Sequence, residues 1–132
     1  MITIRIDVIP HAEQRYDTVG DWRVLYEREG SIWQLDVSET GNWKYNYLIA
    51  LHELIEMGLC VSAKIDDRDV DHFDIEWEPH DNIEEPGDDP EAPYYRQHQI
   101  ACAIERAVAL HLDVKWPEYE AALDKLEKDS AH

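Results

Sequence analysis

Three polar side chains interrupt an otherwise apolar segment and are candidates for chemistry. Between Tyr47 and Val61 the strongly polar residues are His52, Glu53 and Glu56. On a helix these three positions fall within one sector of the surface. A helix that is apolar around the rest of its circumference is a buried helix. Burying an imidazole and two carboxylates is costly unless each finds a partner, so the sequence predicts either a bound cation or a compensating set of side chains.

A divalent metal would compensate these charges directly. His52 and Glu56 lie four positions apart, the spacing at which two side chains project from one helix face and can bind one ion. Glu53 points to the flank of that face, where it can orient and deprotonate a water at the metal. The pattern HELIE matches the HExxH motif of metallopeptidases except at its last position, where Glu56 replaces the second histidine. Carboxylate oxygen is an acceptable zinc ligand, although this exchange changes the charge and the metal preference of the site.

A second long helix offers the third ligand. From about Tyr94 to Leu112 the predicted helix is apolar over most of its surface, and His98, Cys102 and Glu105 form one stripe at i, i+4 and i+7. Two polar stripes on two buried helices suggest that the helices face each other. We therefore expect His98 to complete the metal shell, and Glu105 either to join it or to orient a ligand from outside. Cys102 is expected to be an inert buried thiol.

A purely structural role is the alternative for these groups. A histidine close to carboxylates on facing helices can form a satisfied hydrogen-bond network that fixes the packing. Glu105 is followed by Arg106, with which it can form an ion pair. A di-iron carboxylate site of the ferritin type is disfavoured, because the helices lack paired Glu-x-x-His motifs.

The N-terminal third, residues 1–38, is predicted to be an antiparallel sheet of about three strands that supports the first helix. Residues 2–9 alternate apolar and polar side chains, which is the period-2 pattern of a half-buried strand. Residues 22–28 and 31–37 are rich in aromatic and β-branched residues, and the turn signal at Gly30 predicts a β-hairpin. The apolar side chains of the first strand share one face: Ile2, Ile4, Ile6 and Val8.

The remaining residues are predicted to form three helices and one acidic loop. The motif helix spans residues 43–62, with Asn42 as its N-cap. Residues 65–93 are rich in acidic residues and proline and are predicted to be mostly loop, with a short strand at FDIEW. Two further helices occupy residues 94–128. This order predicts a single α+β domain, residues 1–132, rather than alternating βαβ units.

The acidic loop has a partial calcium-binding spacing. Four acidic residues occupy positions 1, 3, 5 and 12 of an EF-hand loop: Asp67, Asp69, Asp71 and Glu78. EF-hand geometry is nevertheless disfavoured, because position 6, where the sharp turn needs glycine, is His72. The loop is therefore interpreted as a solvated run of charge, from which Asp71 or Asp74 can reach the helix site as an additional metal ligand.

Composition limits the compartment and the partners. Thirty Asp and Glu against twelve Lys and Arg give a formal net charge of -18, which repels nucleic-acid phosphates and anionic membranes, so direct nucleic-acid binding is not expected. The N-terminus lacks the layout of a signal peptide, and the two cysteines lack CxxC spacing, which predicts a cytoplasmic protein without a membrane segment. The same charge would suit a protein that binds a basic partner or imitates the DNA backbone.

Five segments within roughly residues 47–120 carry a recognisable pattern: ALHELIEMGLC, VDHFDIEWE, the EPGDDPEAPY loop, RQHQIACAIERAVA and VKWPEY. They resemble a family of small proteins encoded by phages and prophages, which implies the cytoplasm of a bacterial or phage-infected cell. More distantly, the hairpin leading into HELIE is similar to the core of zincin metallopeptidases. That similarity implies His52 as a ligand, Glu53 as general base and Glu56 as a substituted ligand.

The leading hypothesis is a zincin-like metal-binding domain in which His52, Glu56 and His98 bind zinc or another divalent ion. Glu53 is then expected to activate water for hydrolysis of an amide bond in a peptide or protein substrate. The alternative is a non-enzymatic phage accessory protein whose acidic surface binds a basic protein. Survival of that interaction after chelation would distinguish the two hypotheses.

Overall fold

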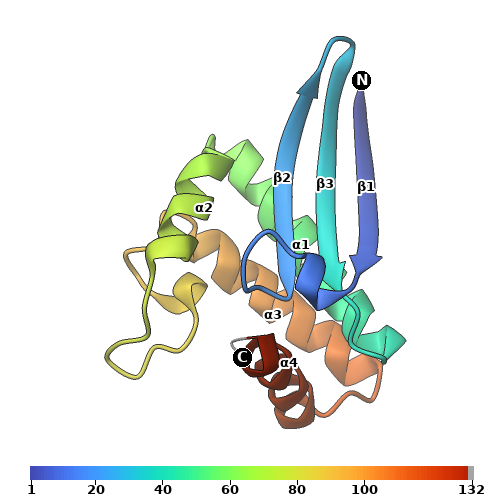
Figure 1. Ribbon diagram of the computed structural model, residues 1–132, viewed down its shortest axis with the longest axis vertical. Coiled ribbons are helices and arrows are strands. Elements are labelled where there is room, and N and C mark those ends of the chain that lie inside the picture. Colours follow the sequence, from blue (N-terminus) through green and yellow to red (C-terminus); the bar gives the residue numbers. More distant parts are fainter. Residues whose placement is uncertain (131–132) are drawn as a thin grey trace.

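The computed structural model describes residues 1–130 and consists of a three-stranded sheet followed by four helices (Figure 1). The elements in chain order are β1 Ile2–Ile9, β2 Gly20–Glu27, β3 Gly30–Ser38, α1 Trp43–Ser62, α2 Asp67–Glu76, α3 Tyr95–His111 and α4 Trp116–Ser130, with 3₁₀ turns at His11–Glu13 and Pro86–Asp88. The predicted α+β class is confirmed. The predicted number of three helices is wrong, because α2 is a fourth.

The sheet has the strand order β1-β3-β2 and is mixed. β2 and β3 form the predicted antiparallel hairpin, whereas β1 pairs with β3 in parallel. The prediction of an all-antiparallel sheet is therefore wrong at β1. The connection after β1, which includes the 3₁₀ turn His11–Glu13, carries the chain to the far edge before β2 begins. Because β2 then turns back into β3, the central strand runs in the same direction as β1.

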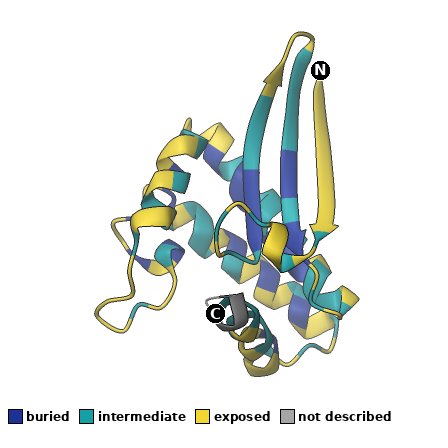
Figure 2. Ribbon diagram, viewed as in Figure 1, coloured by how far each residue is buried: buried dark blue, intermediate teal, exposed yellow. Residues whose placement is uncertain are grey.

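β1 is a strand as predicted, but it is not half-buried. Seven of its eight residues are exposed and Ile9 is intermediate, so the strand is coloured almost entirely as exposed in Figure 2. The register places Ile4 opposite Trp33 and Ile6 opposite Leu35, so the apolar side chains of β1 share the sheet face that bears the core. Helix α1 packs on that face over β2 and β3, which leaves β1 uncovered.

Helix α1 spans the residues predicted for the motif helix. It begins after Asn42, whose side-chain oxygen accepts a hydrogen bond from the Lys44 backbone N–H at 3.0 Å. Its buried residues include His52 and Glu56 as well as apolar side chains such as Leu48 and Met57. The helix therefore has the buried character that its apolar composition predicted.

Helix α2 lies where the sequence predicted a loop and a short FDIEW strand. The Asp66 side chain caps its first turn by accepting from the Arg68 backbone N–H at 2.9 Å. Acidic residues in the first turn also complement the positive end of the helix dipole. Val70 and Phe73 then anchor the helix on the core. Because Asp67–Glu76 is helical, the chain does not form an EF-hand loop here.

Helix α3 lies alongside α1, and α4 follows α3 in the chain, with Tyr119 of α4 packed against Tyr45 of α1 (Figure 1). The prediction that the two polar helices face each other is thus correct. Tyr119 of α4 is buried in a core cluster with Val37 and Ile49. Among residues 1–130, none of the helices has the length and apolar character needed to span a bilayer.

Candidate metal centre

Three side-chain atoms from two helices form a compact triangle. His52 Nε2 lies 3.1 Å from Glu56 Oε2 and 3.2 Å from His98 Nδ1, and the third side, between His98 Nδ1 and Glu56 Oε2, is 3.0 Å. Donor atoms around a tetrahedral zinc ion with bonds of about 2.0 Å lie about 3.3 Å apart. The triangle therefore has the size at which one small divalent ion can contact all three atoms.

The packing of α1 against α3 creates this triangle. His52 and Glu56 are separated by one helical turn and both are buried, while His98 reaches them from α3 and is partly buried. The sequence predicted these three residues as the ligand set, and the structure brings them together. A pair of facing polar stripes at helical spacing was the signal that identified them.

Each triangle residue also has a partner outside the triangle. His52 Nδ1 lies 2.8 Å from Glu105 Oε1, and His98 Nε2 lies 3.4 Å from Asp88 Oδ1. The Trp22 indole N–H donates to Glu56 Oε1 at 3.0 Å. Histidine ligands of metals usually donate their second ring N–H to a carboxylate, which fixes the ring and directs the other nitrogen at the metal. Of the two roles expected for Glu105, the geometry matches the orienting one.

Cys102 offers a second grouping with the same two histidines. Its Sγ lies 3.9 Å from His52 Nδ1 and 3.4 Å from His98 Nε2, so His52, His98 and Cys102 are also close enough to hold an ion. Cys102 contacts the nitrogen of each ring that is opposite to the one near Glu56, so an ion bound through these contacts would not also bind Glu56. Burial tends to raise the pKa of the Cys102 thiol, but hydrogen bonds with His52 and His98 outweigh it and lower the pKa. Cys102 thus contacts both histidines and is partly exposed, while its expected role as an inert thiol stays a prediction.

The charges at the centre are strongly coupled. Burial opposes ionisation of Glu56, but hydrogen bonds with His52 and His98 lower its pKa to about 2. Burial likewise disfavours the charged form of His98, but its contacts with Asp88, Cys102 and Glu56 raise its pKa to about 12. Without a metal, protons on the imidazoles therefore balance the carboxylates. A metal would replace those protons, so its binding should release them.

Glu53 lies against the first residue of β2, on the flank of the triangle. A Cβ atom at Gly20 would be 2.7 Å from Glu53 Oε1, so a side chain at that position would displace the carboxyl group. The Glu53 side chain forms no hydrogen bond to another residue within the described part of the chain. Burial and the charge of Glu56 raise its pKa. The carboxyl group is thus available to a water or ligand in the adjoining space.

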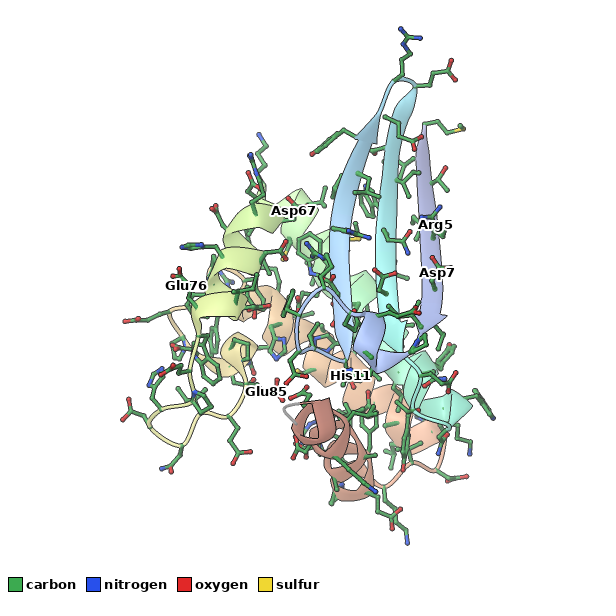
Figure 3. The ribbon with its side chains drawn as sticks, viewed as in Figure 1. Arg5, Asp7, His11, Asp67, Glu76 and Glu85 are labelled. Carbon is green, nitrogen blue, oxygen red and sulfur yellow. The ribbon has the colours of Figure 1, made fainter. Side chains whose placement is uncertain are left out.

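That space is an acidic cleft of about 450 Å³ between the sheet, α1, α3 and α4. The triangle residues line it together with carboxylates from several elements, which include Asp21, Glu53, Asp74, Glu85, Glu120 and Asp124. Glu85 belongs to the α2–α3 connection and lies close to α4 in Figure 3. The cleft gives the triangle access to a ligand, and its charge favours a cationic one.

Asp71 and Asp74, which the sequence suggested as additional ligands, have other partners. Asp71 accepts from the Arg15 guanidinium at 2.9 Å. Asp74 accepts hydrogen bonds from the phenol groups of Tyr94 and Tyr16. Both aspartates line the cleft, but neither contacts a triangle atom.

Sequence reasoning missed the residues that hold the triangle from outside the two helices. Trp22 and Asp88 contact it from β2 and from the 3₁₀ turn Pro86–Asp88. In the same turn, a Cβ at Gly87 would lie 2.5 Å from His98 Cγ and Nδ1. Glycine is therefore needed for the turn to approach the imidazole ring. The Pro-Gly pair in EPGDDP indicated a turn, but nothing in the sequence indicated that the turn supports a histidine.

The environment of Asp74 predicts a pH-dependent stability. Burial raises its pKa to about 7, against about 4 in an unfolded chain. The folded state therefore keeps a proton that the unfolded state loses, so this residue lowers stability as the pH rises from about 4 to 7. In metal-free protein, we expect Asp74→Asn to flatten the fall in melting temperature between pH 5 and pH 8 by a few degrees. An unchanged slope, measured by circular dichroism, would contradict this assignment.

Comparison with protein-family models, with curated proteins and with solved structures gives no significant match for this chain.

Proposed function

We propose that the protein is a zincin-like metal-binding domain that hydrolyses an amide bond. The ligands of the ion, with zinc as the preferred metal, are His52 Nε2, Glu56 Oε2 and His98 Nδ1. The observation that carries the proposal is the triangle of 3.0 to 3.2 Å between these atoms, in which both imidazoles have a carboxylate on the opposite nitrogen. Three protein ligands with an open fourth position are typical of catalytic rather than structural zinc sites.

The triangle is favoured over the grouping with Cys102 for two reasons. Binding through Cys102 would place the ion on His52 Nδ1, which is already 2.8 Å from Glu105. It would also leave Glu56, a buried carboxylate, without the positive charge that an ion bound at the triangle provides. The triangle instead preserves the contacts of Glu105, Asp88 and Trp22.

Glu53 serves as the general base in this proposal. A zinc ion at the triangle would lower the pKa of water and polarise a substrate carbonyl. Glu53 accepts the proton of the attacking water, because its carboxyl group lines the same cleft and has no hydrogen-bond partner among the residues that the structure describes. Its raised pKa suits both acceptance of this proton and its later transfer to the leaving nitrogen.

The substrate class follows from the charge of the cleft. Its carboxylates repel acidic segments and attract basic ones, so we propose a peptide or protein segment with Lys or Arg near the hydrolysed bond. Arg106 also lines the cleft, where its guanidinium lies over the Trp116 ring at 4.7 Å. A volume of about 450 Å³ is within the range typical of small-ligand sites and accommodates a few side chains.

A non-enzymatic protein that binds a basic partner is the second candidate. The net charge of -18 and the acidic cleft favour it, and it needs no metal. Under this alternative the triangle is a hydrogen-bond network that fixes α1 against α3. Binding of a basic partner that is unchanged by chelation would support it.

Zinc titration of the metal-free protein tests the proposed site. We expect one equivalent to bind, and Glu105→Gln to weaken its affinity about 10- to 100-fold, because His52 loses the carboxylate that orients it. The matched control is Glu118→Gln, an exposed glutamate at the start of α4, which should leave the affinity unchanged. Failure of the wild-type protein to take up zinc would refute the proposal, and equal affinities of all three proteins would refute the role of Glu105.

A further inference from the structure

The first strand is an open, apolar sheet edge. β1 pairs with β3 on one side, and no described strand pairs with its other side. Its apolar side chains share one face and are strongly exposed: Ile2 57%, Ile4 52%, Ile6 43% and Val8 47%. Figure 2 shows this exposure along the whole strand. Exposed edges of this length and composition are a surface on which another strand can pair.

The hydrogen-bond pattern shows which backbone groups point to the open edge. The carbonyl of Met1 accepts from the Ser31 N–H at 3.1 Å, and the carbonyl of Ile9 accepts from the Glu39 N–H at 2.8 Å. Odd-numbered residues of β1 therefore direct their backbone groups at β3. Because these groups alternate along a strand, the even-numbered residues Ile4 and Ile6 direct theirs outward. The even-numbered residues thus expose their apolar side chains on one face of the sheet and their backbone N–H and C=O groups at its open edge.

Natural sheet edges are usually protected against pairing by lysine, proline, bulges or inward-pointing charges. β1 has none of these features on its apolar face. Its charged residues, Arg5 and Asp7, lie on the opposite face, where both contact the Gln34 side chain and their mutual distance is 3.3 Å (Figure 3). The side chains of Arg5 and Asp7 are 54% and 49% exposed, so both remain accessible to a further partner.

The strand is complementary to a second copy of itself. Antiparallel pairing about a two-fold axis must match even-numbered residues with even-numbered residues, because these have the outward backbone groups. If Ile4 faces Ile6 of the partner subunit, Arg5 faces Arg5 of the partner subunit, which is repulsive. If Ile6 faces Ile6 of the partner subunit, Arg5 faces Asp7 of the partner subunit on both sides of the axis. Charge thus selects the second register.

We propose that the protein forms a homodimer in which two β1 strands pair antiparallel, with Ile6 at the two-fold axis. The two sheets then form one sheet of six strands, and the apolar side chains of the two edges pack side by side. Since residues 3–9 of β1 pair on each side in this register, the interface is near the small end of the usual range, for which roughly 600 to 800 Å² is buried per subunit. The proposal uses no residue of the metal triangle and is independent of it.

Two charge variants test the dimer and its register together. Arg5→Asp and Asp7→Arg each place like charges opposite one another, so each protein alone should dissociate at least about tenfold more easily than wild type in sedimentation velocity. An equimolar mixture of the two restores both opposite-charge pairs across the interface and should form a heterodimer. Charge pairing within a single subunit cannot produce this recovery.

Arg28→Asp at the exposed hairpin turn is the matched control and should remain dimeric. Circular dichroism spectra and melting curves of each variant establish that the fold is intact. A wild-type protein that stays monomeric up to about 300 µM would overturn the proposal, since edge pairing of this size should be detectable there. Single variants that dimerise like wild type, or a mixture that stays monomeric, would overturn the register.

Discussion

Glu56→Ala is expected to lose the zinc ion that we propose for the wild-type protein. Protein purified without contact with a metal-loaded resin should contain close to one equivalent of zinc in the wild type and less than about 0.1 equivalent in Glu56→Ala and in His52→Ala. Each substitution removes one atom of the triangle, and two remaining protein ligands do not retain zinc against a chelator. The measurement is elemental analysis at equal protein concentration, supported by a competition titration with a chromogenic chelator.

The chain provides a matched control for this result. His72 and Glu76 of α2 have the same i, i+4 spacing and a 3.3 Å contact, but their side chains are 74% and 68% exposed. His72→Ala should therefore keep its zinc, which would show that spacing alone does not make a site. Because Glu56→Ala leaves the Trp22 indole N–H without its partner, Glu56→Gln serves as a variant of similar shape.

Cys102→Ser distinguishes the two groupings of ligands. If the triangle is correct, this variant retains zinc, and the cobalt-substituted protein lacks the charge-transfer absorption of a thiolate–cobalt bond. Loss of zinc in Cys102→Ser together with its retention in Glu56→Gln would contradict the triangle and assign the metal to His52, His98 and Cys102.

The parts of the fold that the sequence predicted correctly are those determined by local periodicity. The aromatic and β-branched runs of β2 and β3, the turn at Gly30 and the apolar run of α1 each have a strong local signal, and Asn42 marks the helix start. The parallel pairing of β1 depends on the path of the connection after Ile9, which no local pattern encodes. α2 was missed because its charges resemble a solvated loop, whereas Asp66 capping and the burial of Val70 make it a helix.

The same distinction applies to the site. His52 and Glu56 are related by helix geometry, so their spacing predicts their contact, and the stripe on α3 identifies His98. Trp22, Gly87 and Asp88 come from elements whose contacts with α1 and α3 depend on the tertiary fold. The sequence could therefore predict the inner atoms of the centre but not the groups that orient them.

Glu53→Gln should abolish hydrolysis while leaving the metal in place. Glutamine keeps the shape of the side chain against Gly20 but cannot accept a proton, so we expect kcat/KM to fall about 10²- to 10⁴-fold. The assay uses zinc-loaded protein and a library of fluorogenic peptides rich in Lys and Arg. Because Glu53 is outside the triangle, the zinc content of the variant should equal that of the wild type.

Glu85→Gln is the matched control, because Glu85 is another carboxylate of the cleft but has an exposed position. It should raise KM for a basic peptide and leave kcat nearly unchanged, since it attracts the substrate without contacting the reacting atoms. A Glu53→Gln protein that remains fully active would remove Glu53 from the mechanism. If wild-type hydrolysis persists after the zinc is chelated, the activity does not come from this site. If zinc binds but no peptide is hydrolysed, the protein is a metal-stabilised domain whose acidic cleft binds a basic partner.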